Sequence, residues 1–208
     1  ACNYKITKNI ASEIIKNFLE VILAPSFDKE SLKILKSKKN LRIIDISNFE
    51  VKNHSSIKFF DNAFLMQSKD NIIISKKNLR CVTKLKPSKR DLNEIEFAYN
   101  ICKHVKSNAI VLCNNFSTIG IGAGQPSRLD SCKIAVQKAK QFQSYKIKNS
   151  IAASDAFFPF ADGINTLIKA GVKTIVQPGG SIRDREVINA ANKAKIKMLF
   201  TGLRHFNH

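Results

Sequence analysis

Apolar residues recur at helical spacing in some segments of this chain and form short continuous runs in others. In the first part the pattern predicts, in order, a helix over 9–19, a strand over 20–25, a helix over 28–39 and a strand over 41–46. Ile10, Ile14, Ile15 and Phe18 mark the apolar face of the first helix, and Asp28 is the expected N-cap of the second. This strand–helix–strand order favours a parallel sheet covered by helices.

The pattern is less regular between residues 47 and 86. FFDNAFLMQSKD (59–70) and NIIIS (71–75) look like strands around a polar turn, although their periodicity is poor. A new unit begins at Pro87, after which the helical pattern becomes strong again. We therefore expect a first unit over 1–86 and a second over 87–208.

The second unit reads as α/β with a mixed sheet. Ser88 is the expected N-cap of a long helix, and NAIVLC and STIGIG, joined by NNF, predict a β-hairpin. The elements expected here are helices over 87–107, 127–142, 162–171 and 184–194, and strands over 108–113, 117–122, 173–178 and 197–202.

Composition limits the class of protein. Hydrophobic residues make up 44% of the chain, an ordinary globular share, and no apolar run reaches the ~18 residues that a membrane helix needs. The 5 cysteines lack CxxC or paired spacing, which favours reduced thiols in a cytoplasmic protein without a metal–cysteine site. The N-terminus has neither a signal-peptide layout nor an initiator Met, so we expect the chain to begin partway through a longer protein.

The formal net charge of +19 admits two explanations. It favours anionic partners such as nucleic acid, phosphorylated metabolites or polycarboxylates. Lysines are, however, spread along the whole chain, and a compositional bias alone would produce the same charge. The densest cluster, KILKSKKN, falls at a predicted helix end, where cations are favoured by the helix dipole and are usually solvated.

Three irregular segments are candidates for chemistry. GIGAGQPSR (120–128) and QPGGSIRD (177–184) each lie between a strand and a helix, where anions bind or where a turn simply needs glycine. SDAFFPFADG (154–163) gathers aromatic rings around a proline, which suits neither a core strand nor an amphipathic helix. Together these segments predict an anion-binding pocket with an aromatic wall, but they do not name a reaction.

Longer motifs in the same order carry a family resemblance. VKSNAIV, TIGIGAGQPSR, SDAFFPFADG and QPGGSIRDREVI, followed by the LRHFNH ending, resemble the 5-aminoimidazole-4-carboxamide ribonucleotide (AICAR) transformylase domain of the bifunctional purine biosynthesis protein family. The resemblance implies a cytidine-deaminase-like, three-layer α/β/α fold, with a partial first unit (1–86) and a complete second unit (87–208). It also implies that the family's IMP cyclohydrolase domain is absent from this chain.

The resemblance implies roles for individual residues. The AICAR-binding positions are Glu20, Asn108, Arg128, Phe157 and Arg204, and the folate-binding positions are Leu129, Asp162, Ser181 and Ile182. Phe157 would lie against the AICAR base, Asn108 would read the carboxamide, and Asp162 would face the pterin of 10-formyltetrahydrofolate. Arg204 would pair with the phosphate, which suits bidentate arginine chemistry.

The implied reaction transfers a formyl group from 10-formyltetrahydrofolate to the 5-amino group of AICAR ribonucleotide. It needs a base for the amine proton and a donor for the tetrahedral oxyanion, which the family supplies through an adjacent Lys–His pair followed by Pro-Ala-Gly. Lys103-His104 lacks that context and lies in the long helix, so we expect the pair upstream of Ala1.

The remaining expectations follow from the missing pair. The chain alone would be inactive, and a homodimer with a shared active site would complete it. Neither zinc, nucleic acid nor membrane is expected as a partner. Two alternatives stay open: a catalytically silent nucleotide-binding paralogue, and a basic nucleic-acid-binding α/β module.

Overall fold

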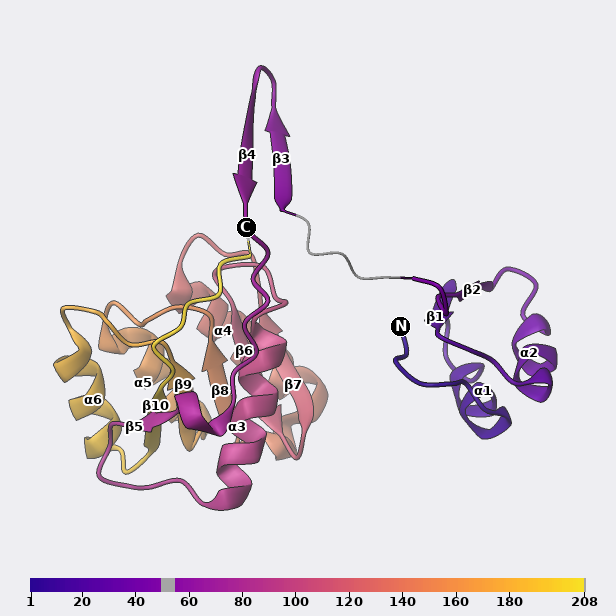
Figure 1. The fold of residues 1–208 in the computed structure, drawn as a ribbon. Coiled ribbons are helices and arrows are strands. Elements are labelled where there is room, and N and C mark those ends of the chain that lie inside the picture. The colour runs from indigo at the N-terminus through magenta and orange to yellow at the C-terminus, as the bar shows by residue number, and fades with distance from the viewer. Residues whose placement is uncertain (50–54, 208) are drawn as a thin grey trace. The chain divides into compact units, whose positions relative to one another are not determined.

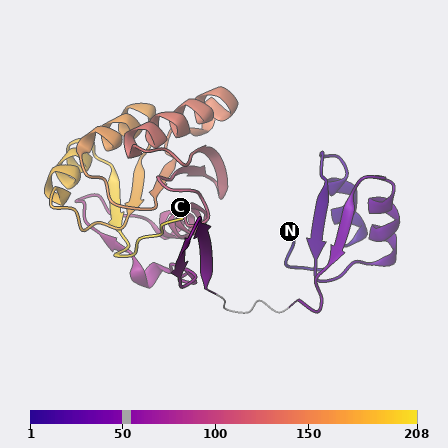
Figure 2. The same ribbon diagram turned by 90° about the horizontal axis from the view of Figure 1, so that it is seen from above.

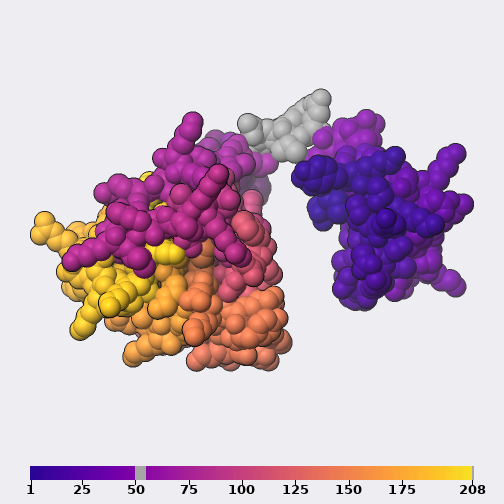
Figure 3. Space-filling model, turned by 90° about the horizontal axis from the view of Figure 1, so that it is seen from below, coloured from indigo at the N-terminus to yellow at the C-terminus, as the bar shows by residue number. Residues whose placement is uncertain are grey.

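The computed structural model describes residues 1–49 and 55–207 and forms two compact units, Ala1–Lys69 and Asp70–His208 (Figure 1). This division lies earlier than the boundary expected after residue 86. The physical reason is β5 (Arg80–Cys81), which pairs antiparallel with β10 (Lys197–Phe200) and so joins the second unit's sheet. Figure 3 shows the magenta surface of this part of the chain against the yellow surface of the C-terminal residues.

The first unit is built on a small parallel sheet. Its elements are α1 (Lys8–Ile14), β1 (Val21–Ala24), α2 (Lys29–Lys36) and β2 (Arg42–Asp45), with β1 and β2 paired in parallel as expected. Asp28 is confirmed as the N-cap of α2, because its carboxylate accepts the Ser31 N–H at 2.6 Å. The core of this unit consists of Ile6, Ala11, Ile22, Ala24 and Leu35.

The first helix is shorter than its pattern predicts. It ends at Ile14 rather than near residue 19, and turn-type backbone bonds follow it, such as Lys16 N–H to the Glu13 carbonyl. Phe18 therefore lies outside the helix and is 89% exposed. Ala11, not Ile10, is the residue of α1 that the core buries completely.

The strand expected over FFDNAFLMQSKD (59–70) is interrupted, because this stretch contains the end of one strand, a turn and a second strand. β3 (Ser56–Phe60) and β4 (Ala63–Gln67) form an antiparallel hairpin that turns at Asp61. The prediction of a strand over NIIIS (71–75) is wrong, since no strand forms there. Ile74 is buried instead, and its N–H is satisfied by the Asn100 side chain at 3.0 Å.

The second unit contains a six-stranded mixed sheet in the order β5-β10-β9-β8-β6-β7. Besides β5 and β10, its strands are β6 (Ile110–Asn114), β7 (Ser117–Gly122), β8 (Ile151–Ser154) and β9 (Thr174–Gln177). The hairpin β6–β7 is confirmed, and β8, β9 and β10 run parallel to one another. Strand β8 was not predicted, although it joins the hairpin to the parallel strands.

Helices cover both faces of this sheet, as Figure 2 shows. α3 (Lys89–Cys102) packs on one face, over a core that includes Tyr99, Val111 and Leu199. The other face is covered by α4 (Arg128–Gln143), α5 (Ala161–Ala170) and α6 (Asp184–Lys193), over a core that includes Leu112 and Ile175. The three-layer α/β/α class is therefore confirmed, and so is Ser88 as the N-cap of α3.

The glycines of GIGAG bring a helix close to the sheet. A Cβ on Gly120 would lie 2.2 Å from the Ala135 carbonyl oxygen, and one on Gly122 would lie 1.9 Å from the Ser131 carbonyl oxygen. Both residues belong to β7, so α4 can approach this strand only because they lack side chains. Anion binding is therefore not needed to explain the glycines at 120 and 122.

Within residues 1–49 and 55–207, we find no helix with the length and apolar character that crossing a membrane requires.

Candidate functional site

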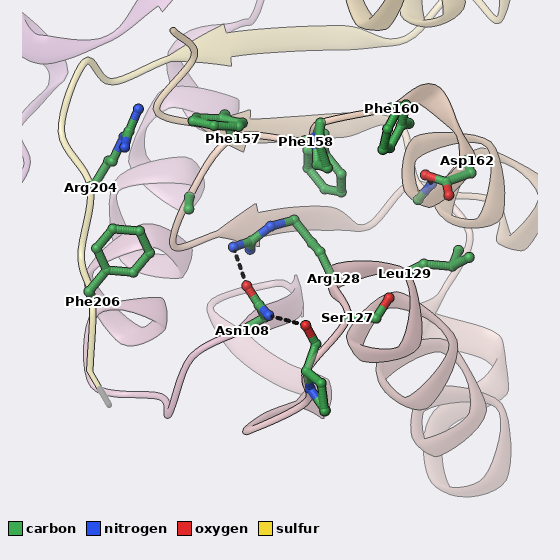
Figure 4. Close-up of a pocket in the computed structure, with 14 residues that line it drawn as sticks. Asn108, Ser127, Arg128, Leu129, Phe157, Phe158, Phe160, Asp162, Arg204 and Phe206 are labelled. Atoms are coloured by element: carbon green, nitrogen blue, oxygen red, sulfur yellow. Dashed lines mark hydrogen bonds between the residues drawn. The ribbon is translucent and has the colours of Figure 1, made fainter. Parts of the chain in front are cut away.

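The carboxyl ends of the central strands open onto a pocket of about 460 Å³ in the second unit (Figure 4). Its walls come from the residues before β6, the start of α4, the loop between β8 and α5, and the segment after β10. The predicted site residues that line it are Asn108, Arg128, Leu129, Phe157, Asp162 and Arg204. Positions far apart in the sequence thus meet in one cavity, at the sheet edge where α/β proteins bind ligands.

A buried ion pair lies behind the pocket. The Arg128 guanidinium donates to the Asp155 carboxylate at 2.5 Å, and their side chains are only 7% and 0% exposed. Arg128 also donates to the Ser154 hydroxyl at 2.8 Å, while the Ser107 hydroxyl donates to Asp155. The charge of Arg128 is therefore neutralised inside the protein and is not free for an incoming anion.

Asn108 is held by the same network. Its side-chain oxygen accepts from Arg128 at 2.7 Å, and its amide nitrogen donates to the Pro126 carbonyl at 3.1 Å (Figure 4). The amide nitrogen also donates to the Gln125 carbonyl at 2.8 Å. Both amide hydrogens are thus used, and one lone pair of the oxygen remains. Asn108 consequently presents a fixed acceptor to the pocket.

The FFPF loop divides its rings between core and pocket. Phe158 is 1% exposed and belongs to the core, where its backbone N–H is bonded by the buried Gln177 side chain at 2.8 Å. All three rings border the pocket, but Phe157 and Phe160 are the more exposed ones (Figure 4). Because Phe158 anchors the loop, its neighbours can present rings to a ligand without regular secondary structure.

Two arginines lie over these rings. Arg204 is exposed, and its guanidinium carbon is 4.7 Å from the centre of the Phe157 ring. Arg183 lies at the same distance from Phe160 but also forms an ion pair with Glu186 at 3.6 Å. In the described part of the chain, no carboxylate forms an ion pair with Arg204. Its full positive charge therefore faces the pocket mouth.

Other predicted site residues lie outside this pocket. Ser181 and Ile182 follow the Gly179–Gly180 turn, and Ile182 is fully exposed. Glu20 lies in the first unit just before β1, where its backbone carbonyl accepts from Arg42 at 2.9 Å. Lys103 and His104 do not line the pocket, and the Lys103 ammonium donates to the Ile72 carbonyl at 2.9 Å.

The residues that sequence reasoning missed are the ones that hold the pocket together. The motifs predict no role for Asp155, Ser107 or Ser154, although their side chains form this buried network. The sequence signal for Asp155 is weak, because it follows the short segment IAAS (151–154), which has little strand character of its own. Its partners could not be read from the chain, because they lie at distant positions.

The cysteines do not contribute an accessible thiolate to this site. All of them are free, as the spacing predicted. Burial raises the pKa of Cys102 well above its usual value, and it raises the pKa of Cys113 and Cys132 to about 12. Over the described ranges, no group of three or more His, Cys, Asp or Glu side chains could hold a metal ion.

The fold and the pocket define an α/β protein with a ligand cavity at the carboxyl edge of its sheet, walled by phenylalanines and a free arginine. The sequence profile of the AICARFT/IMPCHase bienzyme family matches residues 1–138. The chain belongs to this family, which confirms the resemblance carried by its motifs.

Curated proteins match the chain along its whole length. The bifunctional purine biosynthesis protein PurH of Aquifex aeolicus (strain VF5) is 44% identical over 209 residues, covering 100% of this chain and 40% of that protein. PurH of Leptospira biflexa serovar Patoc (strain Patoc 1 / Ames) is 45% identical over 205 residues, covering 98% of this chain and 40% of that protein. The chain therefore spans about 40% of the length of these relatives.

Proposed function

We propose that this chain acts in purine biosynthesis and provides the substrate-binding wall of an AICAR transformylase site. The reaction transfers the formyl group of 10-formyltetrahydrofolate to the 5-amino group of AICAR ribonucleotide. The observation that carries the proposal is the convergence of Asn108, Arg128, Phe157 and Arg204 on one pocket of about 460 Å³, a size that suits a small-molecule ligand.

The contacts of these residues support distinct roles for them. Phe157 offers a half-buried ring for the flat AICAR base, and Asn108 offers a fixed acceptor for the carboxamide N–H. Arg204 takes the phosphate, because its guanidinium is exposed and lacks an ion-pair partner within the described residues. Arg128 cannot do so while Asp155 neutralises it, so it acts as a positioning residue for Asn108.

The folate half of the proposal is supported by neighbouring positions. Leu129 and Asp162 line the pocket beside the phenylalanines, so an apolar contact and a carboxylate acceptor are available to a pterin ring. Ser181 and Ile182 would contact the folate further out, where they lie exposed. Glu20 remains a proposed AICAR contact on the basis of the family resemblance.

The catalytic groups are proposed to come from elsewhere in the protein. Attack of the weakly nucleophilic aromatic amine needs a base and a donor to the oxyanion, and the residues that line the described pocket include neither lysine nor histidine. A Lys–His pair on a partner subunit would complete the site in a homodimer. We propose accordingly that residues 1–86 and 87–208 correspond to a partial and a complete transformylase unit.

The proposal is tested by calorimetric titration of the 208-residue chain with AICAR ribonucleotide and with its phosphate-free nucleoside. We expect Arg204→Ala to weaken ribonucleotide binding about tenfold to hundredfold, as for loss of a hydrogen bond to a charged group, and nucleoside binding much less. Lys173→Ala, which removes an exposed cation away from the pocket, is the matched control. Equal losses for both ligands would refute the phosphate role, and no binding of either would refute the proposed function.

A further inference from the structure

A second cavity of about 420 Å³ lies next to the proposed substrate pocket, at the carboxyl ends of β9 and β10. Its lining includes Arg80, Gly179, Gly180, Phe200, Gly202 and Arg204. Arg204 lines both cavities, so the two are neighbours. None of the residues that line this second cavity is acidic.

Arg80 gives this cavity a second positive charge. It is the first residue of β5 and pairs in register with Phe200 on β10, and its guanidinium carbon lies 5.7 Å from the centre of the Phe200 ring. The side chain is thus placed by a strand pair and an aromatic ring. Across the residues that the structure describes, neither Arg80 nor Arg204 has a carboxylate within ion-pair distance, so both charges are available to a ligand.

Glycines keep the cavity open. Gly180 and Gly202 have φ values of +90° and +68°, and a Cβ on either would meet nothing within 4 Å, so both face empty space. Gly179, with φ of +74°, lies so close to the Phe200 ring that a Cβ would be 2.3 Å from it. The Gly180 N–H donates to the Asp184 carboxylate at 2.8 Å, which fixes the turn. Because this N–H is already used, an anion in the cavity would be bound by the arginines.

We infer that this cavity is an anion subsite, in which Arg80 and Arg204 bind a phosphate or carboxylate group of a ligand whose ring system lies in the aromatic pocket. Guanidinium forks match both oxyanions. The source of the anion rests on the proposed function. The phosphate of AICAR ribonucleotide is one source, because Arg204 is its proposed partner. The glutamate carboxylates of the folate are the other source, because Ser181, a proposed folate contact, directly follows the Gly179–Gly180 turn.

The subsite itself is tested without either substrate. The amide signals of Gly179, Gly180 and Gly202 are followed by NMR while inorganic phosphate is added to the full chain at constant ionic strength. We expect saturable shifts of these signals, and Arg80→Gln should weaken phosphate binding about tenfold, because it removes the charge but keeps much of the stem over Phe200. Lys77→Gln removes a nearby exposed charge that does not line the cavity, and it should leave the affinity unchanged.

Two further titrations identify the source. If the subsite holds the nucleotide phosphate, Arg80→Gln weakens binding of AICAR ribonucleotide but not of its nucleoside. If it holds folate carboxylates, the variant weakens binding of triglutamyl tetrahydrofolate more than of the monoglutamyl form. Absence of phosphate shifts at these glycines, or equal effects of Arg80→Gln and Lys77→Gln, would overturn the inference. Phosphate binding at the glycines without binding of either substrate would retain the subsite and overturn the proposed function instead.

Discussion

Replacement of Asp155 by alanine should destabilise the second unit far more than the loss of one exposed ion pair would. Asp155 is completely buried, and it accepts from Arg128 and from the Ser107 hydroxyl. Without it, the guanidinium of Arg128, 7% exposed, stays in the protein without a counter-charge. Removing one partner of a buried pair costs about 3–5 kcal/mol, so we expect a loss of that size in the free energy of unfolding.

Removal of both charges separates the cost of the unpaired guanidinium from the cost of the lost hydrogen bonds. In the double variant Asp155→Ala/Arg128→Met neither charge of this pair remains, and the remaining costs are lost hydrogen bonds, such as the one to Asn108, worth about 1 kcal/mol each. The double variant should therefore unfold with a loss about 2 kcal/mol smaller than that of Asp155→Ala alone. Asp155→Asn, which keeps an acceptor of similar shape, should fall between wild type and Asp155→Ala.

Urea unfolding followed by hydrogen-exchange mass spectrometry of peptides from β6 and β8 measures this unit specifically. Asp130→Ala is the matched control. Asp130 lies on α4, the helix that begins with Arg128, and it pairs with Lys133 at 3.1 Å on the exposed side of that helix, where ion pairs contribute little to stability. The reasoning is refuted if Asp155→Ala costs less than about 1 kcal/mol, or if the double variant is at least as unstable as it.

Other features give further predictions. The purified chain should show little or no formyl transfer in an assay with AICAR ribonucleotide and 10-formyltetrahydrofolate, and near-normal turnover would bring His104 back as a candidate base. Mixed with a full-length relative that keeps its Lys–His pair but lacks its own wall residues, the chain should restore activity; heterodimers without activity would exclude a shared site. Burial tends to raise the pKa of Asp91, but hydrogen bonds from Lys197 and Ser88 outweigh it and lower the pKa below 3.8. The stability that the ionised Asp91 contributes is therefore complete above pH 3.8 and is lost as the pH falls through the lower pKa of the folded state. Asp91→Asn should accordingly reduce the fall in the free energy of unfolding at acid pH, measured by urea unfolding across the pH range. Gly122→Ala should lower the thermal unfolding midpoint more than Gly202→Ala. A Cβ at 122 would lie 1.9 Å from the Ser131 carbonyl oxygen, whereas one at 202 meets no atom within 4 Å and adds only the strain of a φ of +68°, about 1–2 kcal/mol.

Local patterns in the sequence were sufficient for elements whose signals lie within a few residues. Asp28 and Ser88 were recognisable as N-caps because a cap bonds an N–H only three residues away. The β6–β7 hairpin was recognisable because two apolar runs flank a short polar turn. The long motifs also placed the chain in its family before any fold was known.

Elements without a local signal were missed or misassigned. β8 reads IAAS, which is short and poor in β-branched residues, and its place in the sheet depends on pairing with β6 and β9. NIIIS has strong β propensity but lies where Asn100 of α3 satisfies its backbone at Ile74, so no strand partner is needed. Propensity alone could not reveal either outcome, because distant partners decide both.

The sequence by itself determined the family, the α/β class and which residue types were available for the site: phenylalanines, arginines and an asparagine near strand ends. Only the tertiary structure decided what each arginine can do. Arg128 and Arg204 are equivalent as letters, yet one is neutralised by Asp155 and the other is exposed over Phe157. The availability of a charge depends on burial and on counter-charges brought together by folding, and neither is encoded by a residue's neighbours along the chain.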